Sequence, residues 1–165
     1  RVMMTRYLAI SAICILATGA GAQELSDWGE SGRWKIRIDA ANGHGCLMET
    51  PLEDGSVFQF GNEPDRKGGF FAVYNPEWTD IKDGMETTVK FDFDEKRFSG
   101  EAIGDVSDDR FGARAFFDNP NVQIEFAKNT VMTILGGLGR TLEVDLSGTT
   151  KALAEIEKCQ SEQSK

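Results

Sequence analysis

RTLEVDLSGTTKALAEIEKCQ, residues 140–160, is the stretch that decides how the rest of the chain is interpreted. Its first part alternates apolar and polar residues, as a strand with one buried face does, and its second part has apolar residues at helical spacing. The alternating residues are Leu142, Val144 and Leu146, and those at helical spacing are Ala152, Leu153, Ile156 and Cys159. We therefore predict a strand that leads, after Gly148, into a helix with a cysteine on its apolar face.

The first 22 residues have the features of a secretory signal peptide. Arg1 and Arg6 precede an apolar run at 7–17, and the small residues that follow suit cleavage after Ala22. The apolar run is shorter than the roughly 20 residues that a membrane-spanning helix needs, so we expect no stable membrane span after cleavage. Export to the periplasm of a Gram-negative bacterium, or to the outside of the cell, follows from this interpretation.

The remaining residues, 23–165, have the length of a single β-rich domain with its own core and end in a polar tail at 161–165. The chain carries 18 Lys and Arg against 27 Asp and Glu, a net charge of −9, which becomes −11 if Arg1 and Arg6 leave with the signal peptide. Such a surface repels nucleic acid and anionic membranes. We expect neither of these as a partner.

The cysteines support the same compartment. Cys14 lies in the signal peptide, which leaves Cys46 and Cys159, and an even pair in an oxidising compartment is most simply a disulfide. Closing so long a loop stabilises a fold by about 4–5 kcal/mol in the chain-entropy model. A zinc or redox site would need more ligands or a C-x-x-C spacing, and the sequence has neither. We predict a disulfide between the second strand and the last helix.

Short apolar or alternating runs recur about every dozen residues along the chain, with turn formers between them. The predicted strands cover 34–38, 46–48, 57–60, 69–74, 87–93, 98–103, 110–117, 130–135 and 141–146. This spacing predicts a mainly β, antiparallel sandwich or barrel of about 8–9 strands, with a helix capping its end, and does not choose between sandwich and barrel. Trp28 falls in a polar lead-in, and residues 104–109 are interpreted as an acidic turn.

A short helix is favoured before the last two strands. The Asp-Asn-Pro sequence at 118–120 offers a cap and a proline suited to a first turn. Val122 and Phe126 are spaced as on one face of a helix. Because Ile124 lies between them, the same residues also alternate as in a strand, so both structures remain open for 119–128.

No catalytic, cofactor or nucleic-acid motif stands out. The Gly-Leu-Gly sequence at 137–139 lacks the third glycine and the following helix of a dinucleotide-binding fingerprint, so we interpret it as a hairpin turn and expect no cofactor.

His44 is the only histidine. A Ser-His-Asp triad would have to use it, and a metal site with two histidines cannot form within one chain. Its two flanking glycines favour an exposed turn instead.

Two groups of acidic residues offer the oxygen ligands that calcium prefers. They are Asp92, Asp94 and Glu95, and Asp105, Asp108 and Asp109. Neither group follows the D-x-[DN]-x-[DN]-G order of a calcium loop, so solvated turns are favoured over a metal site. Whether any two carboxylates form a pair that could hydrolyse a glycoside depends on the fold.

Two of the tryptophans differ in their surroundings. Trp34 begins an amphipathic strand and is predicted to lie in the core, whereas Trp78 lies in a polar loop that contains a proline. Folding of Trp78 back over the core is favoured. Exposure for contact with a partner is the alternative, and with His44 it forms the candidate contact surface.

Three short motifs resemble a known family. They are W-x-I-x-I at 34–38, Gly-Cys-Leu-Met at 45–48 and L-x-G-x-x-x-A-L at 146–153. These motifs are similar to those of the invasion-associated locus B proteins, which are small secreted proteins of alphaproteobacteria. The resemblance implies a periplasmic, β-sandwich-like fold with no established catalytic residues and a role at the cell envelope or in host association.

Three functions follow as hypotheses. The first is a non-enzymatic periplasmic or secreted domain that binds a protein or a cell-envelope component. The second is a small periplasmic hydrolase that uses two carboxylates from the acidic turns. The third is an inhibitor that inserts the loop of His44 or Trp78 into a partner. We favour the first, because the sequence contains no assembled catalytic set.

Overall fold

The computed structural model describes residues 25–107 and 110–163, so the predicted signal peptide lies outside the described residues. Within these ranges the chain forms ten strands, two α-helices and one short 3-10 turn. The strands are β1 (Ser26–Ser31), β2 (Trp34–Asp39), β3 (Gly45–Pro51), β4 (Val57–Asn62), β5 (Gly69–Tyr74), β6 (Glu86–Asp92), β7 (Arg97–Ser107), β8 (Arg110–Phe117), β9 (Val131–Leu135) and β10 (Thr141–Asp145). The helices are α1 (Pro120–Lys128) and α2 (Thr149–Gln163), and the 3-10 turn is η1 (Gly137–Gly139).

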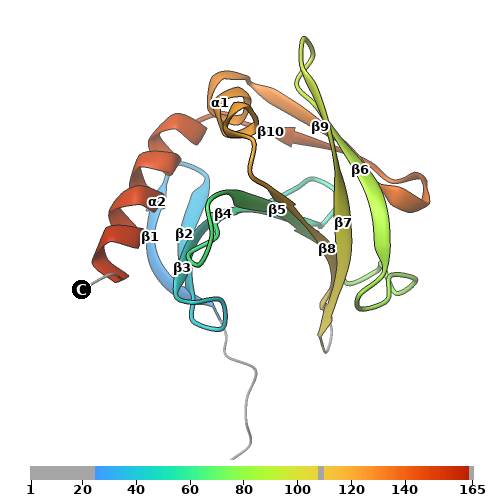
Figure 1. Ribbon diagram of the computed structural model, residues 1–165, viewed down its shortest axis with the longest axis horizontal. Coiled ribbons are helices and arrows are strands. Elements are labelled where there is room, and N and C mark those ends of the chain that lie inside the picture. Colours follow the sequence, from blue (N-terminus) through green and yellow to red (C-terminus); the bar gives the residue numbers. More distant parts are fainter. Residues whose placement is uncertain (1–24, 108–109, 164–165) are drawn as a thin grey trace, which may run out of the picture.

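All ten strands belong to one sheet, in the order β1-β2-β3-β4-β5-β8-β7-β6-β9-β10, and every neighbouring pair is antiparallel. The first five strands follow the chain order. The chain then runs to β6, returns through β7 and β8 to pair with β5, and reaches β9 by way of α1. Figure 1 shows the sheet curling, with β1–β3 and β6–β7 on opposite sides of the molecule. The predicted mainly β, antiparallel class is confirmed, as one curled sheet that is open between β1 and β10.

Two segments differ from the sequence prediction. β1 falls in the region interpreted as a polar lead-in: its sequence SDWGES has no apolar alternation, and it forms by pairing with β2, with an irregularity between Asp27 and Gly29. Residues 104–107, interpreted as part of an acidic turn, are the end of β7. Asp105 lies opposite Gly112 in the ladder, and its carboxylate accepts a hydrogen bond from the Tyr74 hydroxyl at 2.5 Å. Pairing with β8 therefore overrides the local preference of these residues for a turn.

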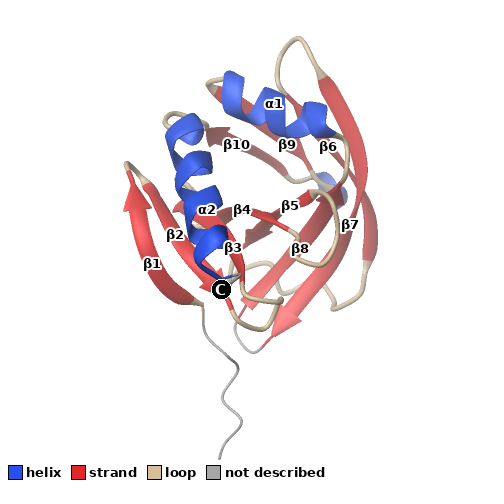
Figure 2. Ribbon diagram, turned by 60° about the vertical axis from the view of Figure 1, so that its left-hand side comes forward, coloured by secondary structure: helices blue, strands red, loops and turns tan. Residues whose placement is uncertain are grey.

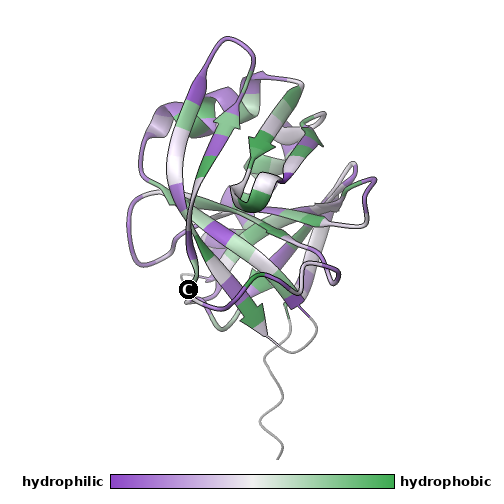
Figure 3. Cartoon of the chain, turned by 90° about the vertical axis from the view of Figure 1, so that its right-hand side faces the viewer, coloured by the Kyte–Doolittle hydropathy of each residue, from purple (hydrophilic) through white to green (hydrophobic). Residues whose placement is uncertain are grey.

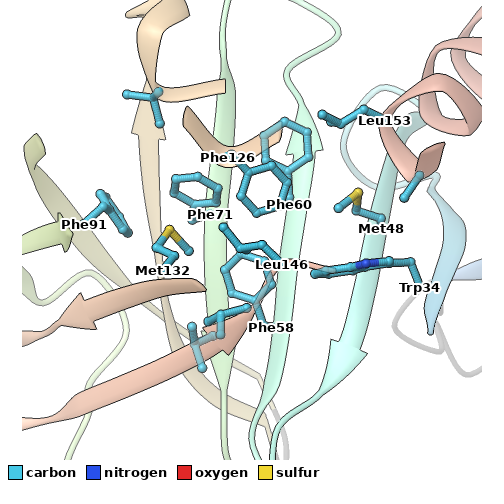
Figure 4. Close-up of a cluster of buried hydrophobic side chains, with 14 of the residues drawn as sticks. Trp34, Met48, Phe58, Phe60, Phe71, Phe91, Phe126, Met132, Leu146 and Leu153 are labelled. Atoms are coloured by element: carbon cyan, nitrogen blue, oxygen red, sulfur yellow. The ribbon is translucent and has the colours of Figure 1, made fainter. Parts of the chain in front are cut away.

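The inner face of the sheet carries an aromatic core. Trp34 is fully buried, as predicted, and its indole N–H donates to the Ser147 carbonyl at 3.0 Å. Phe126 of α1 stacks on Phe60 of β4, with ring centroids 4.8 Å apart. Figure 4 shows this cluster, which includes Trp34, Met48, Phe58, Phe60, Phe71, Phe126, Met132 and Leu146. The core thus joins both halves of the sheet through the first helix.

The segment at 119–128 is a helix, which settles the alternative that the sequence left open. The Asn119 side chain accepts a hydrogen bond from the Asn121 backbone N–H at 3.0 Å, and Pro120 occupies the first turn. This is a normal helix N-terminus, because a capping side chain satisfies a backbone donor and proline needs no partner there. Val122 and Phe126 both point into the core, whereas Ile124 is exposed.

The C-terminal helix α2 packs against β1, β2 and β3 (Figure 2). Its first turn is held against the end of α1: the hydroxyls of Thr149 and Thr150 donate to the carbonyls of Phe126 and Ala127 at 3.0 Å and 2.9 Å. These bonds satisfy carbonyls that the last turn of α1 leaves without helical partners. The predicted strand-to-helix passage after Gly148 is confirmed.

A disulfide joins Cys159 of α2 to Cys46 of β3, as predicted, with the two Cα atoms 6.2 Å apart. Both cysteines are fully buried. Next to the disulfide, the Gln160 side chain accepts a hydrogen bond from the Cys46 backbone N–H at 2.9 Å and donates to the His44 carbonyl at 3.4 Å. The far end of α2 is therefore attached to β3 by the disulfide and by Gln160, and to β1 by a hydrogen bond from the Trp28 indole to the Glu162 carboxylate at 2.7 Å.

The outer face of the sheet has a smaller aromatic cluster. Figure 3 shows how hydrophobic and hydrophilic residues alternate along the strands. Tyr74 lies close against Gly112 of β8, where an added Cβ would come within 2.4 Å of the tyrosine ring. The Arg110 guanidinium stacks over this ring, 3.6 Å from its centroid. The glycine lets the ring lie close to the backbone, and the arginine covers it.

Neither α1 nor α2 is long and apolar enough to cross a membrane.

Candidate functional site

An apolar cavity of about 80 Å³ lies inside the second half of the sheet, between the inner faces of β5–β8 and the β9–β10 hairpin. Side chains from the strands line it, including those of Phe71, Val73, Val89, Phe91, Ile134 and Leu142. One water molecule needs about 10–15 Å³ of such space, so the cavity has room for several non-hydrogen atoms. A space of this kind with apolar walls favours an apolar ligand over water.

Small residues on two neighbouring strands create the apolar cavity. Ala102 of β7 lies directly opposite Ala115 of β8, and Gly104 lies directly opposite Ala113. All four residues line the cavity. Directly opposed positions normally hold side chains that fill the space above the sheet. The small pair Ala102 and Ala115 leaves that space open, whereas the space above Gly104 is taken by the backbone of Lys82.

The loop between β5 and β6 forms one side of the cavity because it is bonded to β7. The Gly84 N–H donates to the Gly104 carbonyl at 2.8 Å, and the Gly104 N–H donates to the Met85 carbonyl at 2.7 Å. At Gly104 a Cβ would lie 2.1 Å from the Lys82 carbonyl oxygen, so only glycine allows this approach. The approach brings Ile81 and Met85 of the loop into the lining.

Trp78 and Arg140 lie at the mouth of the cavity. The Arg140 guanidinium is 4.9 Å from the centroid of the Trp78 ring and donates to the Asp80 carboxylate at 2.5 Å. This hydrogen bond lowers the pKa of Asp80 below its usual value. Arg140 supplies the one charged side chain among the described residues that line the cavity. The mouth is therefore cationic and aromatic, whereas the interior is apolar.

The β9–β10 turn borders the same mouth. It is a hairpin turn, as predicted, in which the Gly136 N–H donates to the Arg140 carbonyl at 2.8 Å. Gly137 packs against Thr87 of β6, where a Cβ would lie 2.8 Å from the threonine side chain. Leu138 is 59% exposed and has a φ of 60°, a conformation that costs a residue with a Cβ about 1–2 kcal/mol. A strained, exposed leucine at the edge of an apolar cavity is a candidate ligand contact.

The two residues of the predicted contact surface lie in different places. Trp78 is half-buried, packs against the core and lines the cavity. His44 is exposed in the turn between β2 and β3, has a φ of 58° and is not part of the lining. Of the two, Trp78 is thus the one that the fold brings to the cavity.

Two of the acidic residues named as possible calcium ligands, Asp92 and Asp105, pair with arginines. Asp92 accepts hydrogen bonds from the Arg97 guanidinium and from the Asp94 backbone N–H, and the first of these lowers its pKa. Asp105 accepts from Tyr74, and Asp108 and Asp109 lie outside the described residues. Among residues 25–107 and 110–163, no three His, Cys, Asp or Glu side chains come together as a metal-binding group.

Carboxylates gather instead at a second, surface depression of about 300 Å³. Its acidic side chains, Glu53, Asp54, Glu143 and Asp145, are all exposed. Asp145 accepts a hydrogen bond from the Ser147 backbone N–H at 2.8 Å and pairs with Arg33 at 2.7 Å; hydrogen bonding to Ser147 is the main cause of its lowered pKa. A catalytic acid needs a raised pKa. Asp145 is therefore not the proton donor that a hydrolase of this kind needs.

The small residues of two consecutive strands are the trace that the apolar cavity leaves in the sequence. The inward-facing positions in the middle of β7 and β8 hold Ala102, Gly104, Ala113 and Ala115, where the other strands carry mostly large apolar side chains. Small residues at alternating positions of two consecutive predicted strands indicate a hollow only when the strands are known to be neighbours. That pairing is a property of the fold.

No protein-family model matches the chain, and no curated protein is significantly similar to it in sequence. Among solved structures, invasion associated protein B from Bartonella henselae matches with a TM-score of 0.56 and 14% sequence identity. The match covers 84% of this chain and 99% of that chain. The chain therefore has a fold similar to that of invasion associated protein B, as the resemblance of its short motifs implied.

Proposed function

We propose that the protein is an exported, non-enzymatic binding domain that takes an apolar group of a protein or cell-envelope component into the apolar cavity. The observation that carries the proposal is the combination of opposed small residues inside, at Ala102 and Ala115, with an aromatic and cationic mouth at Trp78 and Arg140. Binding sites commonly pair an apolar interior with a few polar groups that orient the ligand.

Export is supported by three independent features. The signal-like sequence at 1–22 precedes the fold, the disulfide between Cys46 and Cys159 suits an oxidising compartment, and the fold is similar to that of an invasion associated protein. A periplasmic or extracellular location would place the cavity among lipids, envelope proteins and their apolar segments.

A thermal-shift experiment tests the proposal with a neutral apolar probe. At a 1-octanol concentration about ten times its Kd, binding to the folded state would add about 1.4 kcal/mol to stability, or roughly 3–6 °C in Tm. We expect this shift in the wild type and in Ala154→Leu, which adds a leucine on the exposed face of α2. We expect it to disappear in Ala115→Leu, which fills the cavity.

Ala102→Met is a second filling variant in case Ala115→Leu does not fold. Equal octanol responses in the wild type, in the filled variants and in Ala154→Leu would show that the alcohol acts on the whole protein, and would contradict the proposal. Absence of a stabilising response in the wild type would contradict it as well.

A further inference from the structure

The charge at the mouth of the apolar cavity restricts the ligand further. Arg140 lies at the rim with its side chain 23% exposed, close enough to solvent to meet a ligand and close enough to the cavity to belong to its lining. The other described lining side chains are uncharged. A ligand that fills the cavity therefore places whatever follows its apolar part beside a guanidinium group.

The guanidinium has donors to offer such a group. Arginine carries five N–H donors in a planar fork. Among the described residues, its one hydrogen-bond acceptor is the Asp80 carboxylate, which binds Nη2 at 2.5 Å. Asp80 is an exposed residue of the β5–β6 loop. An incoming anion could use the remaining donors or take the place of this surface carboxylate.

Trp78 adds a second element to the mouth. Its ring lies beside Arg140, with the guanidinium 4.9 Å from the ring centroid, and it also lines the cavity. Tryptophan is suited to a boundary of this kind, because its body is apolar and its ring attracts a cation. Trp78 and Asp80 thus both contact Arg140 at the rim of the cavity.

We propose that the ligand class is an anionic amphiphile, with part of an aliphatic chain in the apolar cavity and an anionic head group on Arg140. This inference rests on the proposed binding function and specifies its ligand. The net charge of −9 disfavours a broad anionic membrane surface, but a single anion at the mouth meets the local charge of Arg140. A cationic head group would have to compete with Arg140 for the Asp80 carboxylate, and a neutral one would gain only an ordinary hydrogen bond.

Three probes with the same alkyl chain test the inference: octanoate, 1-octanol and octylammonium, each titrated by calorimetry below its micelle concentration. We expect octanoate to bind about tenfold more tightly than octylammonium, with 1-octanol between them. Arg140→Gln should weaken octanoate about tenfold and leave 1-octanol within about twofold of the wild type. This split between head groups is a result that simple loss of cavity shape would not produce.

Asp80→Asn provides a variant that keeps the shape of the loop and tests the same point if Arg140→Gln does not fold. Because it removes the carboxylate that competes for Arg140, we expect it to strengthen octanoate binding and leave 1-octanol unchanged. Equal affinity for all three probes, unaffected by either substitution, would overturn the inference while leaving the proposed function intact. Failure of all three probes to bind would overturn both.

Discussion

Ala102 of β7 and Ala115 of β8 lie directly opposite each other on the inner face of the sheet, where both are almost fully buried. The next inward pair, Gly104 and Ala113, is equally small, and the Lys82 backbone lies over Gly104. The surrounding core is filled by aromatic and branched side chains. The cavity therefore exists because the side chains at these positions are small. Filling it should cost the fold little, whereas filling a packed position should cost it a great deal.

A pair of alanine-to-leucine substitutions measures this difference. We expect Ala115→Leu to raise the free energy of unfolding by up to about 2 kcal/mol, because three added carbons enter existing space. Ala152→Leu, at a fully buried position where α2 packs on the core, should lower it by about 1–3 kcal/mol. Denaturant unfolding of both variants gives the comparison. Equal destabilisation would mean that no usable hollow lies at Ala115.

The disulfide gives a second prediction. Intact Cys46 and Cys159 should resist alkylation in the exported protein unless a reductant is added first, as peptide mass spectrometry can show. Because the two cysteines are 113 residues apart, the double variant Cys46→Ser/Cys159→Ser should lose about 4–5 kcal/mol of unfolding free energy. Two alkylated thiols in unreduced protein would contradict the bond.

Tyr74 should make the fold sensitive to alkaline pH. Burial raises the pKa of its hydroxyl above the usual value, and Asp105 adds to the effect while Arg110 opposes it. Since the folded pKa exceeds the unfolded value of about 10, this stability is complete below about pH 10 and falls as the pH rises beyond it. Phenylalanine at this position cannot ionise, so Tyr74→Phe should lack this loss.

The expected curves for the wild type and Tyr74→Phe therefore converge as the pH rises. Near pH 8 the variant should be less stable by about 1.5–3 kcal/mol, because it lacks the hydrogen bond from the hydroxyl to the Asp105 carboxylate. Urea unfolding at pH 8, 9, 10 and 11 measures the difference directly. A constant difference across this range would show that Tyr74 ionises equally in both states.

Leu138→Gly separates stability from binding at the mouth of the cavity. Glycine accepts a φ of 60° without the cost that leucine incurs, so the variant should be as stable as the wild type or more stable by up to about 1 kcal/mol. It should bind octanoate about fivefold more weakly, because the apolar contact is lost. A strongly destabilised variant would show that Leu138 serves packing instead.

Much of this fold could be predicted from local patterns. The alternation in 34–38 and 141–146 and the helical spacing in 149–163 depend on neighbouring residues alone, and they locate β2, β10 and α2. β1 escaped prediction because SDWGES has little apolar character and depends on β2 for its pairing. Whether the strands form a sandwich, a barrel or one curled sheet depends on long-range pairing, such as β5 with β8 and β6 with β9.

The candidate site was harder to predict for the same reason. Trp78 could be identified because a tryptophan in a polar loop is conspicuous, yet its neighbour Arg140 is 62 positions away and carries no motif. The cavity itself comes from the opposition of Ala102 to Ala115, which exists only once β7 and β8 pair in this register. Small side chains that leave a cavity are harder to recognise in a sequence than the residues of a catalytic motif.

A titration of ¹⁵N-labelled protein with 1-octanol, followed by ¹H–¹⁵N NMR, tests the central claim most directly. The account predicts saturable shifts concentrated at the amides of Ala102, Ala113 and Ala115 and at the Trp78 indole, with little change in α2. In Ala115→Leu these shifts should be lost while the rest of the spectrum stays folded. Absence of saturable shifts at these sites in the wild type would contradict the account.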